Sequence, residues 1–276
     1  MPTLFLNVDT TDDSSYIFFF FIPFFTAIGA ALFFSFRYHY WFKYRPVEPH
    51  YKVILEKYYE YYRKLPIKLK GDFERRVSLF IRGKTFFGKD GIEITDEMRV
   101  LVAATAVQIT FGFQFFQLPR FSKILIYPTK YYSQQTHKHH KGEVYPMGRW
   151  IRLSWDSFLH GLENSTDGIN LGLHEMTHAM SLENRIKNNG VHSFINPKAY
   201  AQWKPLALAE MKKIKRKEKS LFRAYAATNL EEFLAVSVEV FFEQTEAFNN
   251  YHTELYKATC GVLKQDPLSN KLKRNG

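Results

Sequence analysis

Two histidines four residues apart constrain this chain more than any other feature. The stretch LGLHEMTHAM, residues 171–180, carries His174 and His178, with Glu175 directly after the first histidine. Residues four apart leave the same face of an α-helix, so both imidazole rings would point the same way. Two neutral ring nitrogens can hold one Zn²⁺ ion, but a catalytic site needs a third protein ligand and an open position for water. The stretch therefore predicts a helix, and a zinc centre only if another segment supplies that ligand.

The segment YAATNLEEFLAVSVEVFFE, residues 225–243, can supply the third ligand. Read as a helix, it places Glu232, Glu239 and Glu243 on one side, while apolar residues cover much of the remaining surface. A helix so apolar is buried, and buried carboxylates must be paired or bind a metal ion. We expect Glu232 to complete a His₂Glu zinc site with the two histidines. Glu239 would accept the spare N–H of a ligating histidine from outside the metal's own ligands.

The two segments together resemble the zinc peptidases of the Mlc titration factor A family, which are distantly similar to the catalytic domain of bacterial lethal factor. The likeness also includes GKDGIEITDEMRVLVAATA, ILIYP, IRLSWDSFLHG, DGIN and QDPL, so it extends from Phe73 to Leu268. In that family the first glutamate of the EFF group is the third zinc ligand, and the tyrosine seven residues earlier lies over the metal. The resemblance implies these two roles for Glu232 and Tyr225.

Zinc chemistry then predicts how such a site would hydrolyse peptide bonds. Zn²⁺ held by His174, His178 and Glu232 keeps an open position and lowers the pKa of a bound water to about 7. Glu175 lies beside a ligand without being one, so it would take the proton from that water and pass it to the leaving amine. Tyr225 would donate a hydrogen bond to the oxyanion. The partner of this site would be a peptide or protein substrate.

An uncharged run near the N-terminus predicts a membrane anchor. From Ser14 to Phe36 no residue is charged over 23 positions, which is long enough to cross a hydrocarbon core of about 30 Å. Arg37, Lys43 and Arg45 follow among aromatic residues, as expected on the cytoplasmic side of a membrane. We expect a single-pass helix in the inner (cytoplasmic) membrane, with the catalytic domain facing the cytoplasm.

The remaining pattern predicts an α+β fold that is mainly helical, a zincin-like metallopeptidase domain with a small sheet. ITDEMRVLVAATAVQITFG, residues 94–112, reads as a buried helix capped by Thr95 or Asp96, whereas residues 123–128 and 149–155 read as strands. The expected organisation is a short N-terminal segment (1–13), the transmembrane helix (14–36), a juxtamembrane linker and helix (37–71) and the zinc peptidase domain (72–276).

Two other classes of protein compete with the peptidase. A formal net charge of +11 suggests nucleic-acid binding, but we expect no nucleic-acid partner because no helix-turn-helix, RNA-binding or zinc-finger signature is present. The basic residues are spread out, and the one dense run, 211–219, reads as the solvated face of a helix. The alternative is a regulatory protein with a structural zinc ion that sequesters a cytoplasmic partner such as a transcription repressor.

Cysteine and histidine usage weighs against a structural zinc site. Such a site is closed by a fourth Cys or His ligand, and neither motif supplies one. Cys260 is the single cysteine, which excludes an intramolecular disulfide and fits a reducing compartment. His137, His139 and His140 lie between lysines, so we expect an exposed loop there rather than a metal site.

Overall fold

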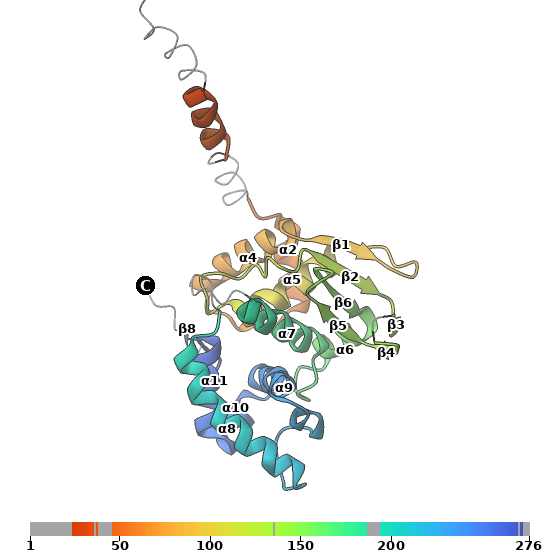
Figure 1. The fold of residues 1–276 in the computed structure, drawn as a ribbon, viewed down its shortest axis with the longest axis vertical. Coiled ribbons are helices and arrows are strands. Elements are labelled where there is room, and N and C mark those ends of the chain that lie inside the picture. Colours follow the sequence, from red (N-terminus) through yellow and green to blue (C-terminus); the bar gives the residue numbers. More distant parts are fainter. Residues whose placement is uncertain are drawn as a thin grey trace, which may run out of the picture. The chain divides into compact units, whose positions relative to one another are not determined.

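Helices dominate the computed structural model, which describes residues 24–35, 37, 46–134, 136–186, 194–269 and 271–272 (Figure 1). The chain divides into two compact units, Met1–Pro46 and Val47–Gly276. The helices of the second unit are α2 (Pro49–Tyr58), α3 (Glu60–Lys64), α4 (Ile67–Arg82), α5 (Asp96–Thr110), α6 (Trp155–Glu163), α7 (Leu171–Ile186), α8 (Pro197–Lys215), the 3₁₀ helix η1 (Ala224–Ala227), α9 (Leu230–Glu243), α10 (Thr245–Tyr251) and α11 (Thr253–Leu263). Its strands are β1 (Thr85–Gly88), β2 (Lys123–Tyr127), β3 (Tyr131–Ser133), β4 (Lys138–His140), β5 (Gly142–Tyr145), β6 (Trp150–Ser154), β7 (Gln265–Asp266) and β8 (Lys271–Leu272).

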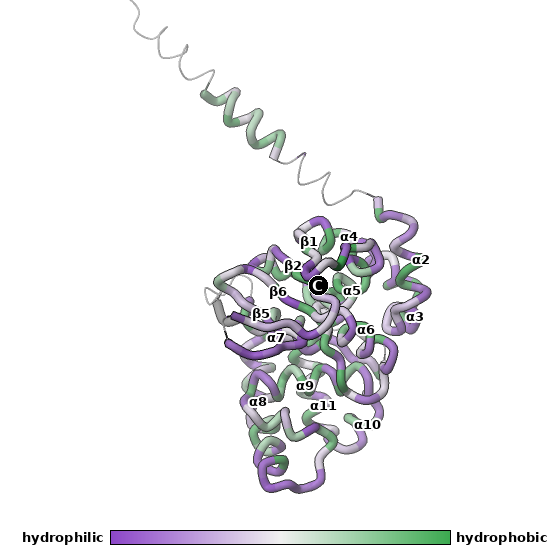
Figure 2. The backbone as a smooth tube through the Cα atoms, turned by 90° about the vertical axis from the view of Figure 1, so that its right-hand side faces the viewer, coloured by the Kyte–Doolittle hydropathy of each residue, from purple (hydrophilic) through white to green (hydrophobic). Residues whose placement is uncertain are grey.

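Helix α5 is the buried helix predicted for residues 94–112. Thr95 is its N-cap, since the Thr95 hydroxyl accepts the Met98 N–H at 3.2 Å, and Asp96 and Glu97 favour the first turn. The Ala- and Val-rich run that follows is buried and packs against α2, α4 and α7. Figure 2 shows the hydrophobic stretches of α5 and α9 inside the second unit. These two helices form much of its core.

The main sheet has the strand order β1-β2-β6-β5. The first three strands run parallel, and β2 and β6, the two predicted strands, are neighbours from Lys123↔Trp150 to Tyr127↔Ser154. Strand β5 is antiparallel to β6 and forms one edge of the sheet, where it contacts α7. The expected mainly helical α+β architecture with a small sheet is confirmed. In Figure 1, α7 lies between the sheet and the helices α8–α11.

The segment that precedes α4 belongs to the same compact unit. Helix α2 packs against α5, and Leu55 is fully buried. Tyr59, just after α2, donates its buried hydroxyl to Gln108 Oε1 of α5 at 2.6 Å. The segment expected as a juxtamembrane linker and helix (37–71) thus contains α2 and α3, and α2 rests on the core.

The predicted location in the cytoplasmic membrane is wrong. Among the described residues, no helix combines the length and the apolar character needed to cross a membrane. The described part of the predicted 14–36 anchor is helical over residues 24–35. The other residues of that prediction, 14–23 and 36, lie outside the described part of the chain.

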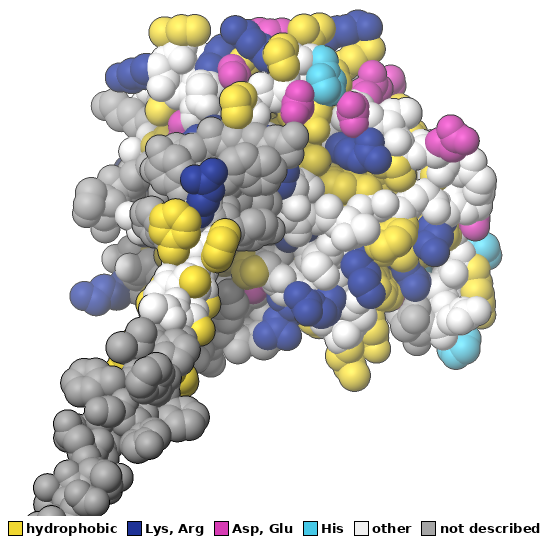
Figure 3. Space-filling view, turned by 90° about the horizontal axis from the view of Figure 1, so that it is seen from above, with side chains coloured by type: hydrophobic (Ala, Val, Ile, Leu, Met, Phe, Trp, Pro, Cys, Tyr) yellow, Lys and Arg dark blue, Asp and Glu magenta, His cyan; other side chains and the backbone are white. Residues whose placement is uncertain are grey.

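The histidine cluster is not the plain loop that we expected. Strands β3 and β4 form an antiparallel hairpin, in which Tyr131 faces His140 and Tyr132 faces His139. The hairpin still leaves His137 and His139 exposed, in keeping with their lysine neighbours. On the face of the molecule drawn in Figure 3, Lys and Arg side chains are interspersed with acidic and apolar ones. The basic excess thus forms no continuous patch on that face.

Two glycines test how tightly the core is packed. A Cβ atom on Gly112 would lie 2.3 Å from the Leu263 carbonyl oxygen, whereas one on Gly71, in exposed α4 surface, would meet nothing within 4 Å. We expect Gly112→Ala to lower the free energy of unfolding by about 1–3 kcal/mol, because the backbone must shift. Gly71→Ala should raise it by about 0.5–1 kcal/mol through helix propensity. Urea unfolding of both variants measures this, and an unchanged midpoint for Gly112→Ala would contradict the packing.

Candidate metal centre and active site

Helix α7 brings the two histidines of the opening motif together. The helix begins after Asn170, whose side-chain oxygen accepts the Leu173 N–H at 3.0 Å and whose carbonyl accepts the His174 N–H at 2.9 Å. The helical turn then places His174 and His178 on one face, with their Nε2 atoms 3.1 Å apart. The two rings therefore meet at one point, as their spacing in the sequence predicts.

Glu232 approaches the same point from α9. Asn229 caps that helix, and its side-chain oxygen accepts the N–H groups of Glu231 and Glu232, each at 2.9 Å. The Oε2 atom of Glu232 lies 3.1 Å from His174 Nε2 and 3.4 Å from His178 Nε2. Burial alone would raise the pKa of Glu232, but the two histidines outweigh burial and hold it far below its ordinary range. The Glu232 side chain is therefore a carboxylate aimed at both rings.

These three atoms fit the ligand set of a divalent metal ion. In a tetrahedral site with ligand bonds of about 2.0–2.1 Å, neighbouring ligand atoms are about 3.3 Å apart. The separations of 3.1, 3.1 and 3.4 Å match that spacing. Within the described ranges, His174, His178 and Glu232 form one group whose ligand atoms all lie within 4.8 Å of one another. Two imidazole nitrogens and one carboxylate oxygen are also the donor types that zinc accepts.

Glu239 lies two turns farther along α9 than Glu232 and contacts the other ring nitrogen of His174, Nδ1. Its side chain is only 1% exposed, and its Oε1 is 2.8 Å from His174 Nδ1. Arg223 donates to the same oxygen at 2.6 Å, and the Asn170 N–H donates to Oε2 at 2.6 Å. A carboxylate beside Nδ1 favours the neutral tautomer with its proton on Nδ1, and in that tautomer the lone pair of His174 Nε2 faces His178 and Glu232.

Glu175 lies on the other side of α7, against the sheet edge. The side chain is 6% exposed, and a Cβ atom on Gly142 of β5 would lie 2.4 Å from its Oε1. Only glycine leaves room for the carboxylate at this point. Burial raises the pKa of Glu175, while the nearby charges of His174 and His178 oppose that shift. Glu175 thus lies within electrostatic range of both histidines.

Tyr225 lies on the 3₁₀ helix η1, ahead of α9. Its ring centroid is 6.1 Å from that of His174, and the side chain is 51% exposed. Partial burial and the Glu232 carboxylate raise the pKa of its hydroxyl to about 12, so it stays protonated and can donate a hydrogen bond. The half-exposed tyrosine lies beside the group of three ligand atoms.

Among the described strands, β5 is the outermost at its end of the main sheet, and its residue Gly142 lies against Glu175. Ser154 donates its N–H to the Lys141 carbonyl at 2.7 Å, which marks a hydrogen-bonded pair in the β5–β6 ladder. Bonded and non-bonded pairs alternate along an antiparallel ladder. The main-chain groups of Gly142 and Val144 therefore point away from β6, toward the open side of the sheet.

Comparison with known proteins places these residues in a family. The family model described as glucose-regulated metallo-peptidase M90 matches residues 34–262, which include every residue of the site. The chain belongs to this M90 family. A Synechocystis protein, slr2042, of uncharacterised function, is 27% identical over 241 residues, covering 82% of this chain and 87% of its own length. Mlc titration factor A of Yersinia pestis and of Yersinia pseudotuberculosis are each 27% identical over 213 residues, 71% of this chain and 77% of each relative.

Two residues that organise this M90 site were not predicted from the sequence. Asn170 caps α7 and donates to Glu243 Oε1 at 2.9 Å, and Arg223 contacts Glu239 and the Gly168 carbonyl. The turn DGIN before a helical run does signal an N-cap, which would have identified Asn170. No spacing in the sequence points to Arg223, because its position depends on how η1 packs.

The role of Asn170 can be tested through stability. Asn170→Ala removes three side-chain hydrogen bonds, to Leu173 N, the Gly161 carbonyl and Glu243. We expect the free energy of unfolding to fall by roughly 1–3 kcal/mol. The control is Thr95→Ala, which removes one capping bond from α5 and should cost about 1 kcal/mol. Because Asn170→Ala removes three hydrogen bonds and Thr95→Ala removes one, we expect the larger loss for Asn170→Ala in urea unfolding, and a loss well below about 1 kcal/mol for Asn170→Ala would contradict the placement of Asn170 at the junction of α7 and α9.

Proposed function

We propose that this protein is a zinc-dependent peptidase in which His174, His178 and Glu232 hold the metal. The observation that carries the proposal is the convergence of Glu232 Oε2 with both histidine Nε2 atoms at 3.1 and 3.4 Å. Membership of a family described as metallo-peptidases supports it. So does the histidine–carboxylate pair of His174 and Glu239, since such pairs orient metal-binding imidazoles.

In this proposal the chain's own residues move the protons. Bound zinc would supply Lewis-acid chemistry, polarising the substrate carbonyl and lowering the pKa of water. Glu175 accepts the proton of the attacking water at its carboxylate and later gives it to the leaving amine nitrogen. Tyr225 donates its hydroxyl hydrogen to the oxygen on which negative charge develops. Arg223 and Glu239 hold His174 in place and touch no reacting atom.

The outer edge of β5 suggests how a substrate would be held. An extended peptide can pair with the outward main-chain groups of Gly142 and Val144 by adding a strand to the sheet. That position would bring the peptide alongside Glu175, which packs against Gly142. Main-chain pairing gives affinity without demanding one sequence, so the substrate class is an extended segment of a peptide or protein.

A second candidate function is regulation through a protein partner. Some relatives carry the name Mlc titration factor A, which describes those proteins as acting on Mlc. The same ligand set could then stabilise a surface that binds a partner without cleaving it. The two functions differ in one respect, because only the peptidase needs Glu175 as a base and Tyr225 as a donor.

The ligand set predicts how zinc affinity responds to single changes. Glu232→Ala removes one of three ligands, so the affinity for zinc should fall by more than the roughly 10–100-fold that loss of an outer hydrogen-bond partner costs. His174→Ala and His178→Ala should do the same. Glu231→Ala is the control, because Glu231 is the exposed neighbour on the same turn. Titration with zinc in competition with a fluorescent chelator measures the zinc affinity of all four variants. If Glu232→Ala still bound one zinc ion per chain, Glu239 would be the third ligand in place of Glu232.

Chemistry can be separated from metal binding by two further changes. Glu175→Gln keeps the size of the side chain and removes the base, so zinc should remain bound while turnover falls about 10²–10⁴-fold. Tyr225→Phe removes one donor and should lower kcat by about 10²–10³-fold, with little change in KM. Tyr251→Phe, on exposed α10 surface, is the control and should leave kcat unchanged.

Turnover in these experiments is measured by mass spectrometry on a mixture of peptides of varied sequence. Full cleavage by Glu175→Gln would exclude the proposed peptidase mechanism. Zinc binding without cleavage by the unmodified chain would favour the regulatory function instead.

A further inference from the structure

Tyr131, the first residue of β3, carries a buried hydroxyl that has no hydrogen-bond partner among the residues that the structure describes. Its side chain is only 3% exposed. A buried hydroxyl without an acceptor destabilises a fold, and the large majority of buried polar atoms in proteins have a partner. We therefore expect an acceptor within reach of this hydroxyl.

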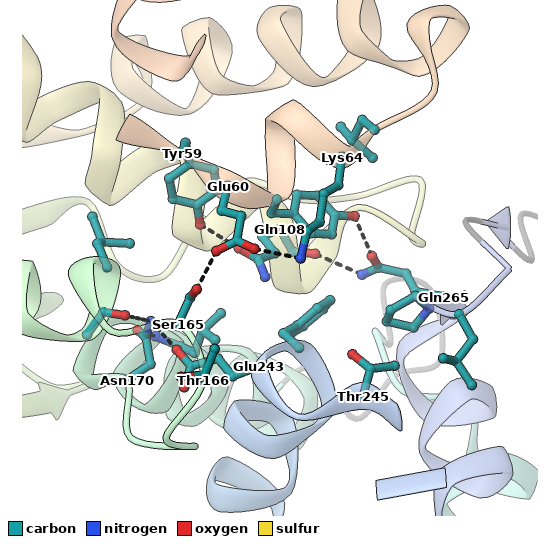
Figure 4. A pocket seen from close by; sticks show the side chains of 18 of the residues that line it. Tyr59, Glu60, Lys64, Gln108, Ser165, Thr166, Asn170, Glu243, Thr245 and Gln265 are labelled. Carbon is teal, nitrogen blue, oxygen red and sulfur yellow. Dashed lines mark hydrogen bonds and ion pairs between the residues drawn. The ribbon is translucent and has the colours of Figure 1, made fainter. Parts of the chain in front are cut away.

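The other deeply buried tyrosines have such acceptors. Besides Tyr131, three described tyrosines are no more than 3% exposed. Each of them donates its hydroxyl to a side-chain oxygen: Tyr59 to Gln108 at 2.6 Å, Tyr62 to Glu74 at 2.5 Å and Tyr256 to Asp266 at 2.7 Å. Figure 4 shows the first of these bonds. In the other two, the acceptor beside the buried tyrosine is a carboxylate.

Two carboxylates lie near the Tyr131 hydroxyl. Burial raises the pKa of Tyr131 well above its ordinary range, and the charges of Glu175 and then Glu143 raise it further. The hydroxyl therefore keeps its proton and can donate it in a hydrogen bond. Glu143 already has donors, because Ser133 Oγ lies 3.1 Å from both of its oxygens and Arg152 donates to one of them at 3.3 Å. Glu175 is the carboxylate that remains.

The Glu175 carboxylate lacks donors of its own. Its side chain is 6% exposed, and no residue in the described part of the chain donates a hydrogen bond to it. A carboxylate removed from water needs donors or opposite charges to replace its hydration. Tyr131 is thus a buried donor without an acceptor, and Glu175 is a buried acceptor without a donor.

The register of the hairpin brings these two residues to one edge of the sheet. Tyr131 pairs with His140 across β3 and β4. Two residues farther along the chain, Gly142 begins β5, and Glu175 Oε1 lies 2.4 Å from the position of a Cβ atom on that glycine. The hairpin therefore carries Tyr131 to the place that Glu175 reaches from α7.

The Tyr131 ring is held on two sides. It stacks on the Tyr127 ring with centroids 4.2 Å apart, and the Arg152 guanidinium carbon lies 5.7 Å from its centroid. The Glu175 side chain, by contrast, has three rotatable bonds. A change in the Glu175 rotamer, rather than a movement of the tyrosine, would therefore bring the carboxylate onto the hydroxyl.

We propose that Tyr131 is a positioning residue for Glu175, whose hydroxyl donates to one carboxylate oxygen and leaves the other oxygen for the attacking water. The role of Glu175 as a base rests on the proposed peptidase function, whereas the bond between the two side chains does not. Tyr131 keeps its own proton and touches no reacting atom. A base held in one orientation reacts faster than one that must first find it.

A double-mutant cycle in urea unfolding of the full chain tests the bond without requiring activity. Tyr131→Phe should lower the ratio of folded to unfolded chain about threefold or more when Glu175 is present, and it should not lower this ratio in the Glu175→Ala background. Removing a hydroxyl that has no partner would instead leave the ratio unchanged or raise it. The same effect of Tyr131→Phe in both backgrounds would overturn the proposal.

Catalysis provides the second measurement. Tyr131→Phe should lower kcat about tenfold or more and leave KM and the affinity for zinc unchanged, because Tyr131 contacts neither substrate nor metal in this proposal. Tyr127→Phe is the matched control, since it removes a hydroxyl from the other ring of the same stack, and it should leave kcat unchanged. An unchanged kcat in Tyr131→Phe, or an equal fall in Tyr127→Phe, would contradict the positioning role.

Failure of this proposal and failure of the peptidase function give different results. Coupling between Tyr131 and Glu175 in a chain that cleaves no peptide would support the bond while excluding the peptidase, and with it the positioning role. Cleavage by the unmodified chain without coupling in the cycle would exclude the role of Tyr131 and leave the peptidase proposal standing.

Discussion

The buried carboxylate of Glu239 is the interaction on which the rest of the site depends. Removing a carboxylate from water costs several kcal/mol unless partners replace the lost hydration. Here His174, Arg223 and the Asn170 main chain supply those partners, at 2.6 to 2.8 Å. They come from α7, from the residue before η1 and from the cap of α7. One carboxylate of α9 therefore joins the start of α7, which is remote in the sequence, to the residue before η1.

Two faces of α7 acquire different chemistry from this arrangement. One face presents the histidines to α9, where Glu232 completes the group of three ligand atoms. Another face presents Glu175 to β5, where Gly142 leaves room for the carboxylate. The sheet edge and α9 thus flank the same helical turn. A peptide lying along the edge would have the proposed base on one side and the proposed metal ligands close by.

Spacing along single helices made much of the site predictable. His174 and His178 meet because residues four apart share a helix face, and Glu232 and Glu239 were expected from carboxylates on a helix too apolar to be exposed. Arg223 and Gly142 were not predicted, because their places depend on contacts between segments remote in sequence. The membrane prediction failed differently. An uncharged run satisfies the composition of a membrane span, yet within the described residues no helix has both the length and the apolar character to cross a membrane.

Zinc K-edge X-ray absorption on the full chain, loaded with one equivalent of zinc, is the sharpest test of the proposed metal centre. The proposed site predicts only nitrogen and oxygen ligands at about 2.0–2.2 Å, with the scattering pattern of two imidazole rings. Cys260 is buried in α11 and should contribute nothing. A sulfur shell at about 2.3 Å, or the pattern of three or more imidazoles, would contradict a metal centre built from His174, His178 and Glu232.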